Sequence, residues 1–390
     1  MTESAKSRTV QRMQPFASTI FAEMTELAVR HGATNLGQGF PDSDGPAAML
    51  EVARQAIADG VNQYPPGRGM PVLRQAIAAD RARRYRSQYD PDDQVLVTVG
   101  ATEAISAAVL GLVEPGAEVV LIEPYYDSYA AAVALAGAVR RVATLTPDGD
   151  GFALDLDSVR AVIGPKTRML VVNSPHNPTG SVLRRDELVA LAEIACEHDL
   201  LVLTDEVYEH LAFDGHKHLS IADFPGMYER TVVVSSAAKT FSVTGWKTGW
   251  ACGPADLIDG VRAAKQFMTF VAGGPFQPAV AYALDHEQDW VVGLRAQLQD
   301  KRTRLSAALT DAGFGVKRSD GGYFVCADIG LLGETDAIEF CRSLPERVGV
   351  AAVPVSAFAD SVASWNRLVR FTFCKRDETL DAGIAGLGRL

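Results

Sequence analysis

A lysine follows a run of β-branched and small residues between residues 231 and 249 of the chain. The run Thr231–Val234 predicts a buried strand, and the small residues after it predict a turn that presents Lys239. A buried ammonium is costly, and desolvation or a neighbouring cation lowers its pKa, which makes the amine a nucleophile able to form a Schiff base. Lys247, eight residues later, could be that second cation or face a phosphate. An ordinary solvated lysine is the alternative.

Two other predicted strands end in polar groups. Gly100, Ala101 and Thr102 follow the strand predicted at Val95–Val99 and open a helix, whose N-terminal amides can bind a phosphate. An ordinary glycine turn with a threonine cap is the alternative. Asn177 follows another strand and lies between two prolines, which would fix the position of its amide.

An acid and an aromatic residue follow two further strands. Asp205 stands at the end of the apolar run Leu200–Thr204, where a carboxylate needs a partner, and Tyr208 follows it. A structural ion pair is the alternative for this acid. Tyr125 follows the strand Glu118–Ile122 and offers an aromatic face. Together these strand ends supply what a pyridoxal phosphate ring needs: phosphate donors, an aromatic plate, an amide, a buried acid and a Schiff-base lysine.

The elements that position these groups alternate between strand and helix from residue 94 onward, which is typical of a parallel α/β sheet. Ligands bind at the carboxyl ends of parallel strands, so these residues should meet at one edge of the sheet. The seven predicted strands are Val95–Val99, Glu118–Ile122, Arg140–Thr144, Arg168–Asn173, Leu200–Thr204, Thr231–Ser235 and Gly249–Gly253. The predicted helices include Ser18–Arg30, Ala47–Asp59, Met70–Arg86, Thr102–Leu112, Arg185–Glu197, Pro254–Ala272 and Gln288–Ala312.

A change of pattern near residue 285 predicts a second, smaller α+β domain. We expect an N-terminal arm with part of the small domain at residues 1–45, a large domain at 46–285 and the small domain at 286–390. The small domain's predicted strands are Gly315–Arg318, Tyr323–Asp328, Val350–Pro354 and Leu368–Phe373.

Composition limits the classes of function. The 390 residues carry a net charge of −11 from 37 basic and 48 acidic residues without charge blocks, which argues against nucleic-acid binding. Apolar runs stay well short of the ~18 residues that span a membrane, and residues 1–30 lack the layout of a signal peptide, so we expect a cytoplasmic protein. The five cysteines are scattered, so we expect reduced core residues and no metal site.

The motifs keep one order along residues 35–371, and in that order they resemble a class I pyridoxal-phosphate aminotransferase of fold type I. Within that family the chain is similar to the N-succinyldiaminopimelate, kynurenine and glutamine aminotransferases. The motifs are Gly37–Asp42, Tyr64 with Gly67–Gly69, Gly100–Thr102, Glu123–Tyr126, Asn177–Gly180, Asp205–Tyr208, Ser236 with Lys239–Phe241, Gly245–Gly249 and Arg370–Phe371.

The resemblance implies catalytic roles for four residues. Lys239 would carry the cofactor and act as the base that moves the substrate's α-proton. Asp205 would pair with the pyridine nitrogen, while Tyr208 and Asn177 would bind the ring oxygen. The resemblance also implies that the Asn177–Pro178 peptide bond is cis.

The resemblance further implies the remaining contacts to cofactor and substrate. Tyr125 would stack on the ring, and Tyr64 would reach the phosphate of a neighbouring subunit, so the active form would be a homodimer. The phosphate would be bound by Gly100, Ala101, Thr102, Ser236 and Lys247. Lys247 stands where many relatives have arginine, so the charge is kept but bidentate binding is lost.

Substrate binding is expected to centre on an arginine near the C-terminus. Arg370 would grip the substrate α-carboxylate with help from the backbone near Gly39. The entrance would be formed by Phe21, Phe40 and, from the partner subunit's copy of the segment Phe267–Phe276, Phe270.

We therefore expect an aminotransferase that exchanges an amino group between an amino acid and 2-oxoglutarate. The preferred substrate is N-succinyl-LL-2,6-diaminopimelate, a step of lysine biosynthesis, with exposed Arg68 as one cation for its remote carboxylates. A kynurenine or glutamine aminotransferase, with β-elimination of cysteine conjugates as a side reaction, is the alternative. An effector-sensing module of a transcription regulator is a weaker alternative, because little chain precedes the first motif.

Overall fold

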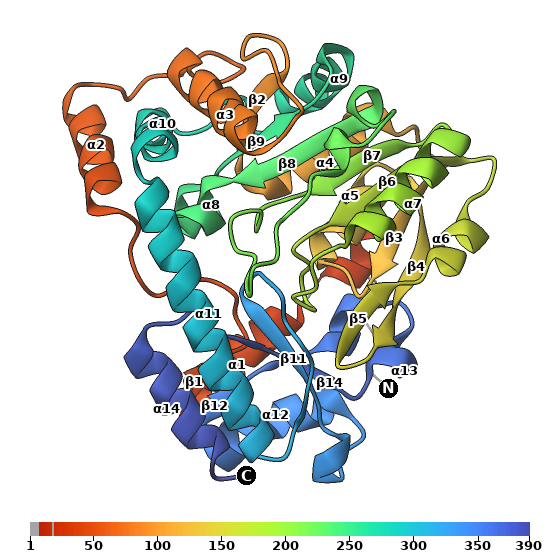
Figure 1. Cartoon of the computed structure of the whole chain (residues 1–390), viewed down its shortest axis with the longest axis vertical. Helices are drawn as coiled ribbons and strands as arrows, with labels where there is room; N and C mark the ends of the chain where they lie inside the picture. Colours follow the sequence, from red (N-terminus) through yellow and green to blue (C-terminus); the bar gives the residue numbers. More distant parts are fainter. Residues whose placement is uncertain (1–7, 18) are drawn as a thin grey trace.

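The computed structural model describes residues 8–17 and 19–390, which form a large part built on one sheet and a smaller part below it (Figure 1). In the described chain the large sheet has eight strands in the order β2-β9-β8-β7-β6-β3-β4-β5. Their bounds are β2 (Val95–Val99), β3 (Glu118–Glu123), β4 (Val139–Asp148), β5 (Gly151–Leu154), β6 (Thr167–Asn173), β7 (Leu201–Asp205), β8 (Thr231–Ser236) and β9 (Thr248–Cys252).

Helices cover both faces of this sheet because its central strands are apolar on both sides. One face packs on α4 (Gly100–Leu112), α5 (Asp127–Leu135) and α9 (Ala255–Lys265). The other face packs on α2 (Ala47–Ala58), α3 (Pro71–Arg84), α6 (Leu156–Val162), α7 (Arg185–Glu197) and α10 (Phe276–His286). The short helix α8 (Ala237–Thr240) directly follows the C-terminal end of β8 (Figure 1).

The smaller part has a four-stranded sheet in the order β10-β11-β14-β13. The long helix α11 (Gln288–Asp311) runs from the large part into it (Figure 1). A parallel pair of β1 with β12 brings the N-terminal segment into this part. The remaining bounds are α1 (Ile20–His31), β1 (Thr34–Asn35), β10 (Gly315–Val316), β11 (Phe324–Asp328), α12 (Ala337–Val348), β12 (Val350–Ala351), β13 (Val353–Pro354), α13 (Val362–Trp365), β14 (Leu368–Thr372) and α14 (Asp377–Leu387).

Several sequence predictions need correction. The sheet has eight strands where seven were predicted, because Gly151–Leu154 returns antiparallel to the end of β4. The helix predicted at Pro254–Ala272 is shorter in the structure, because α9 ends at Lys265. The Lys265 ammonium donates a hydrogen bond to the carbonyl oxygen of Phe270 in the segment after the helix. Cys196 is exposed, whereas the other four cysteines are buried.

Other predictions agree with the structure or stay open. The helix predicted from Ser18 begins at Ile20, and Ser18 itself lies outside the described residues. The domain boundaries predicted after residues 45 and 285 stay predictions. Among the residues that the structure describes, no helix combines the length and apolarity needed to cross a bilayer.

Candidate active site

A cavity of about 350 Å³ lies where the ends of β6, β7 and β8 meet the smaller part. Most of the residues singled out from the sequence line it. They are Phe21, Gly39, Phe40, Gly100, Ala101, Thr102, Asn177, Asp205, Tyr208, Ser236, Lys239, Lys247 and Arg370. Residues that are far apart in the sequence therefore form one site.

Lys239 lies in α8, where β8 delivers it into the cavity. Its ammonium donates to the Gly39 carbonyl oxygen at 3.3 Å and lies 5.8 Å and 5.5 Å from the ring centres of Tyr208 and Tyr323. No carboxylate forms an ion pair with it in the described chain. Burial lowers the pKa of Lys239 to about 8, so a far larger fraction of this amine is neutral and nucleophilic near neutral pH than of a solvated lysine.

Asp205 ends β7 and is almost fully buried. Its carboxylate accepts hydrogen bonds from the Tyr129 hydroxyl at 2.7 Å and the Val207 amide at 3.2 Å. Burial raises the pKa of Asp205 to about 6, although both hydrogen bonds favour the ionised form. A buried carboxylate of this kind is suited to pair with a cationic ring nitrogen in the cavity.

Asn173 connects Asn177 with Asp205. Its side-chain oxygen accepts a hydrogen bond from the Asn177 backbone amide at 2.8 Å, and its side-chain nitrogen donates to the Asp205 backbone carbonyl oxygen at 2.9 Å. The Asn177–Pro178 peptide bond is cis, as predicted. Asn173 thereby positions Asn177 relative to Asp205.

The N-terminus of α4 and Lys247 form an anion-binding corner. A Cβ on Gly249 would lie 2.5 Å from the Gly100 carbonyl carbon and 2.6 Å from the Ala101 nitrogen, so only glycine lets β9 approach the helix start this closely. Lys247 adopts a left-handed conformation, with φ 52°, and its ammonium lies close over Gly100. A helix N-terminus next to an ammonium favours a phosphate group.

Arg370 is a buried cation surrounded by aromatic rings. Its guanidinium carbon lies 3.9 Å from the ring centre of Phe324, 4.7 Å from Phe358 and 5.3 Å from Phe21. It donates to the Asn177 side-chain oxygen at 2.9 Å and to the Gly37 carbonyl oxygen at 2.8 Å, but Nε has no partner. Burial lowers the pKa of Arg370 to about 10. With no carboxylate paired to it in the described chain, Arg370 is suited to bind an anionic ligand.

Comparison with known proteins places this geometry in a family. Residues 32–387 match the family model "Aminotransferase class I and II". The chain belongs to the class I and II aminotransferases. It is 62% identical, over 98% of both chains, to the probable N-succinyldiaminopimelate aminotransferase DapC of Mycobacterium tuberculosis. It is also 36% identical, over 97% of this chain and 89% of the relative, to human kynurenine–oxoglutarate transaminase 3.

A solved structure supports the same assignment. The N-succinyldiaminopimelate aminotransferase from Mycobacterium tuberculosis superposes with a TM-score of 0.96 and 63% identity, covering 97% of this chain and 99% of that one. This aminotransferase therefore has the fold type I architecture, and it is an enzyme that transfers an amino group between an amino acid and a 2-oxo acid.

The structure places four predicted residues of this aminotransferase outside the cavity. Tyr125 does not line it, because its hydroxyl donates to Asp360 at 2.7 Å; the neighbouring Tyr126 lines it instead. Arg68 pairs with Asp259 at 2.5 Å, so it does not reach a substrate in this cavity. The last two, Tyr64 and Phe270, are exposed and pack edge to face, with ring centres 5.4 Å apart.

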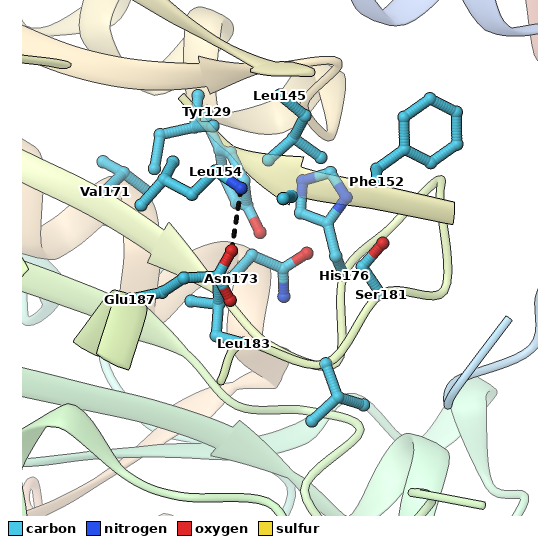
Figure 2. A pocket seen from close by; sticks show the side chains of 13 residues that line it. Tyr129, Leu145, Phe152, Leu154, Val171, Asn173, His176, Ser181, Leu183 and Glu187 are labelled. Carbon is cyan, nitrogen blue, oxygen red and sulfur yellow. Dashed lines mark hydrogen bonds between the residues drawn. The ribbon is translucent and has the colours of Figure 1, made fainter. Parts of the chain in front are cut away.

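A second cavity of about 20 Å³ adjoins the active site, and Figure 2 shows the side chains that line it. Tyr129 and Asn173 line both cavities, and His176 lies on the far side of the small one. Burial lowers the pKa of His176 to about 4, so this histidine is neutral near pH 7. The volume suffices for one water molecule.

Sequence reasoning missed several residues that line the active site. They are Gln38, Tyr126, Tyr129, Asn173, Thr244 and Phe324. Asn173 carried a usable signal, because it is the last residue of a strand that was predicted correctly. Tyr129 carried none, since it lies inside α5 and reaches Asp205 only through the packing of α5 on the sheet.

Proposed function

We propose that this aminotransferase works with pyridoxal 5′-phosphate. The supporting observation is the set of groups that the cavity combines. It holds a nucleophilic lysine and a buried carboxylate, together with two cations that have no ion-pair partner among the described residues: Lys239, Asp205, Lys247 and Arg370. Lys239 would hold the cofactor covalently, Asp205 would face its ring nitrogen, and Lys247 with the α4 N-terminus would bind its phosphate. When bound, the cofactor supplies an electron sink for the substrate carbanion.

The chain's own groups then account for proton transfer and orientation. Lys239, as a base with a lowered pKa, would take the proton from the substrate α-carbon. Arg370 would bind the substrate α-carboxylate through its terminal nitrogens, while Phe324 and Phe358 exclude water around it. The Asn177 side-chain oxygen already accepts from Arg370, so its side-chain nitrogen would be left to donate into the cavity, which Tyr208 also lines.

Tyr126 replaces Tyr125 as the residue proposed to stack on the ring. It lines the cavity immediately before α5, next to the residues at the start of α4. Burial raises the pKa of Tyr126, so its phenol stays protonated at neutral pH. An aromatic face at this position would hold a flat ring parallel to it.

The proposed substrate is N-succinyl-LL-2,6-diaminopimelate, with 2-oxoglutarate as the amino acceptor. The observation that carries this proposal is the 62% identity over 98% of both chains to a relative named for that substrate. A kynurenine or glutamine aminotransferase is the second candidate, supported by the more distant kynurenine–oxoglutarate transaminase.

A panel of amino donors compared by kcat/KM separates the two candidates, because that ratio measures discrimination directly. N-succinyl-LL-2,6-diaminopimelate is expected to exceed kynurenine, glutamine and methionine. If any of these three turns over far faster, the substrate proposal is wrong, while the assignment to the aminotransferases stands.

We also propose a homodimer in which each subunit contributes to its neighbour's site. The support is the exposed aromatic pair of Tyr64 and Phe270, with Tyr64 80% and Phe267 87% exposed in the single chain. Sedimentation of the enzyme with activity measured across a dilution series tests it. Activity should fall as the dimer dissociates, and a fully active monomer would rule it out.

A further inference from the structure

A third cavity, of about 430 Å³, lies away from the active site and shares no lining residue with it. It is formed by the end of α3, by residues 209–218 and by the first two turns of α11. Its charged and imidazole side chains are Arg83, Arg84, Glu209, His210, His216, Lys217, His218 and Arg295. We propose that this cavity binds a small anion with two or more negative charges, such as a phosphate compound or a polycarboxylate.

Cations with unused donors line the cavity. Lys217 and Arg295 are exposed and form no hydrogen bond or ion pair with the described part of the chain. Arg84 binds Asp80 through Nε alone, at 3.2 Å to each carboxylate oxygen, which leaves its terminal nitrogens free. The chain as a whole carries a charge of −11, so this local surplus of cations is unlike its average surface. Such a surplus attracts anions.

The one carboxylate in the lining is already compensated. Glu209 lies 3.4 Å from the Arg81 guanidinium and accepts hydrogen bonds from the Tyr85 hydroxyl at 2.8 Å and the Ser235 hydroxyl at 2.6 Å. Its charge is therefore directed into the protein interior, and it opposes an anion in the cavity only weakly.

His210 supplies an independent indication of a ligand. His210 lines the cavity and is only 5% exposed. Neither nitrogen of its imidazole ring has a hydrogen-bond partner in the described part of the chain. The nearest carboxylate oxygens to Nε2 belong to Asp80, at 3.9 Å, and Glu209, at 4.0 Å, beyond hydrogen-bond distance. A buried donor without an acceptor costs free energy, which a bound anion would recover.

A metal ion fits this place less well. Glu206, Glu209 and His218 bring their ligand atoms within 4.8 Å of one another. However, the Arg81 guanidinium lies 2.9 Å from Glu206 and 3.4 Å from Glu209, where a divalent cation would have to compete with it. The carboxylates are thus engaged by a protein cation, whereas Lys217 and Arg295 in the cavity lining have no ion-pair partner among the described residues.

Calorimetric titration of the holoenzyme with inorganic pyrophosphate and, separately, with citrate tests the proposal at constant ionic strength. At least one of the two anions should bind saturably, and the tighter of the two identifies phosphoryl or carboxylate chemistry as the natural source. Lys217→Gln and Arg295→Gln should each weaken this binding about twofold to fivefold, as expected for exposed ion pairs worth up to about 1 kcal/mol. Both variants should keep the wild-type kcat.

Two controls make the test decisive. Lys166→Gln removes an exposed lysine outside the cavity and should leave anion affinity unchanged. His210→Leu removes ring nitrogens that have no partner, so it should weaken anion binding without lowering the Tm of the ligand-free protein. The proposal fails if neither anion binds, if binding survives in the Lys217→Gln/Arg295→Gln double variant, or if Zn²⁺ binds instead and His218→Ala abolishes that binding.

Discussion

The Tyr129 hydroxyl donates a hydrogen bond to Asp205 Oδ2 across 2.7 Å. Tyr129 belongs to α5 and Asp205 to the end of β7, so this contact fixes the carboxylate from a helix that packs on the sheet. It also favours the ionised form of an acid whose pKa burial raises to about 6. The ability of Asp205 to pair with a cationic ring nitrogen thus depends on a residue that the sequence motifs do not mark.

Replacing this tyrosine should change both the rate and the pH dependence. Tyr129→Phe removes a hydrogen bond to a charged group, worth about 1.5–3 kcal/mol, so kcat/KM should fall about tenfold or more. The lost bond stabilised the carboxylate, so the pKa of Asp205 rises and the acid limb of the kcat/KM profile should move to higher pH. In Tyr228→Phe, which loses a hydroxyl bonded to the Gln88 carbonyl oxygen, the profile should stay in place.

Lys239 should reduce the stability of the cofactor-free protein. Its folded pKa, about 8, lies below the ordinary value of 10.5, so the folded state binds this proton less tightly than the unfolded state. The free-energy cost of keeping this lysine protonated in the folded state is fully present below pH 8, and it disappears as the pH rises toward 10.5. Lys239→Met should therefore raise the free energy of unfolding by about 1–3 kcal/mol at pH 7, and less at pH 10.

Urea unfolding of the cofactor-free variants at both pH values measures this effect. Lys247→Met is the matched control, because Lys247 is exposed and should give little change at either pH. A destabilised Lys239→Met protein at pH 7 would show that the buried ammonium is compensated in the folded state.

Lys247 should determine cofactor affinity more than it affects the chemistry. Lys247→Gln removes the cation over the start of α4, so the Kd for pyridoxal 5′-phosphate should rise about tenfold, as expected for a charge-assisted hydrogen bond. Lys247→Arg keeps the charge and should restore most of the affinity. Spectroscopic titration of the cofactor-free enzyme measures it, and equal Kd values for all three proteins would place the phosphate elsewhere.

Lys375 lies directly behind Phe40 in the cavity wall, and we predict that its charge supports binding of a remote carboxylate of the substrate. Its ammonium donates to the Phe40 carbonyl oxygen at 2.7 Å and lies 4.3 Å from the centre of the Phe40 ring, which lines the cavity. In Lys375→Gln, KM for N-succinyl-LL-2,6-diaminopimelate should rise about threefold to tenfold, with KM for methionine unchanged. A parallel rise for both donors would instead indicate a general disturbance of the Phe40 loop.

Where a site residue directly follows a strand, the sequence sufficed to predict it. Lys239, Asp205 and Asn177 all lie close after apolar runs, and the carboxyl ends of parallel strands meet at one edge. Residues placed by distant packing could not be predicted in this way. The sequence predicts Tyr125 as the stacking residue, and nothing local shows that its hydroxyl bonds to Asp360, 235 residues away.

The same reasoning explains the other errors. Arg68 looked free in the sequence, but folding brings Asp259, 191 residues away, to within 2.5 Å of it. The long-range pairing of Arg68 with Asp259 is set by tertiary contacts, which a local pattern does not contain. The strand β5 is a different case, because its hairpin with β4 is local; Gly151–Leu154 is a short run that follows a turn-rich segment, and the prediction did not assign it to a strand.

The central claim is that Lys239 is the residue that carries the cofactor. Borohydride reduction of the holoenzyme followed by peptide mapping tests it most directly, because the reduced bond marks the attached amine permanently. We predict that the pyridoxyl label is found on Lys239, at the end of β8, and that Lys239→Ala takes up no label. A label on Lys247, or on Lys265 beside the Phe270 carbonyl oxygen, would contradict the account.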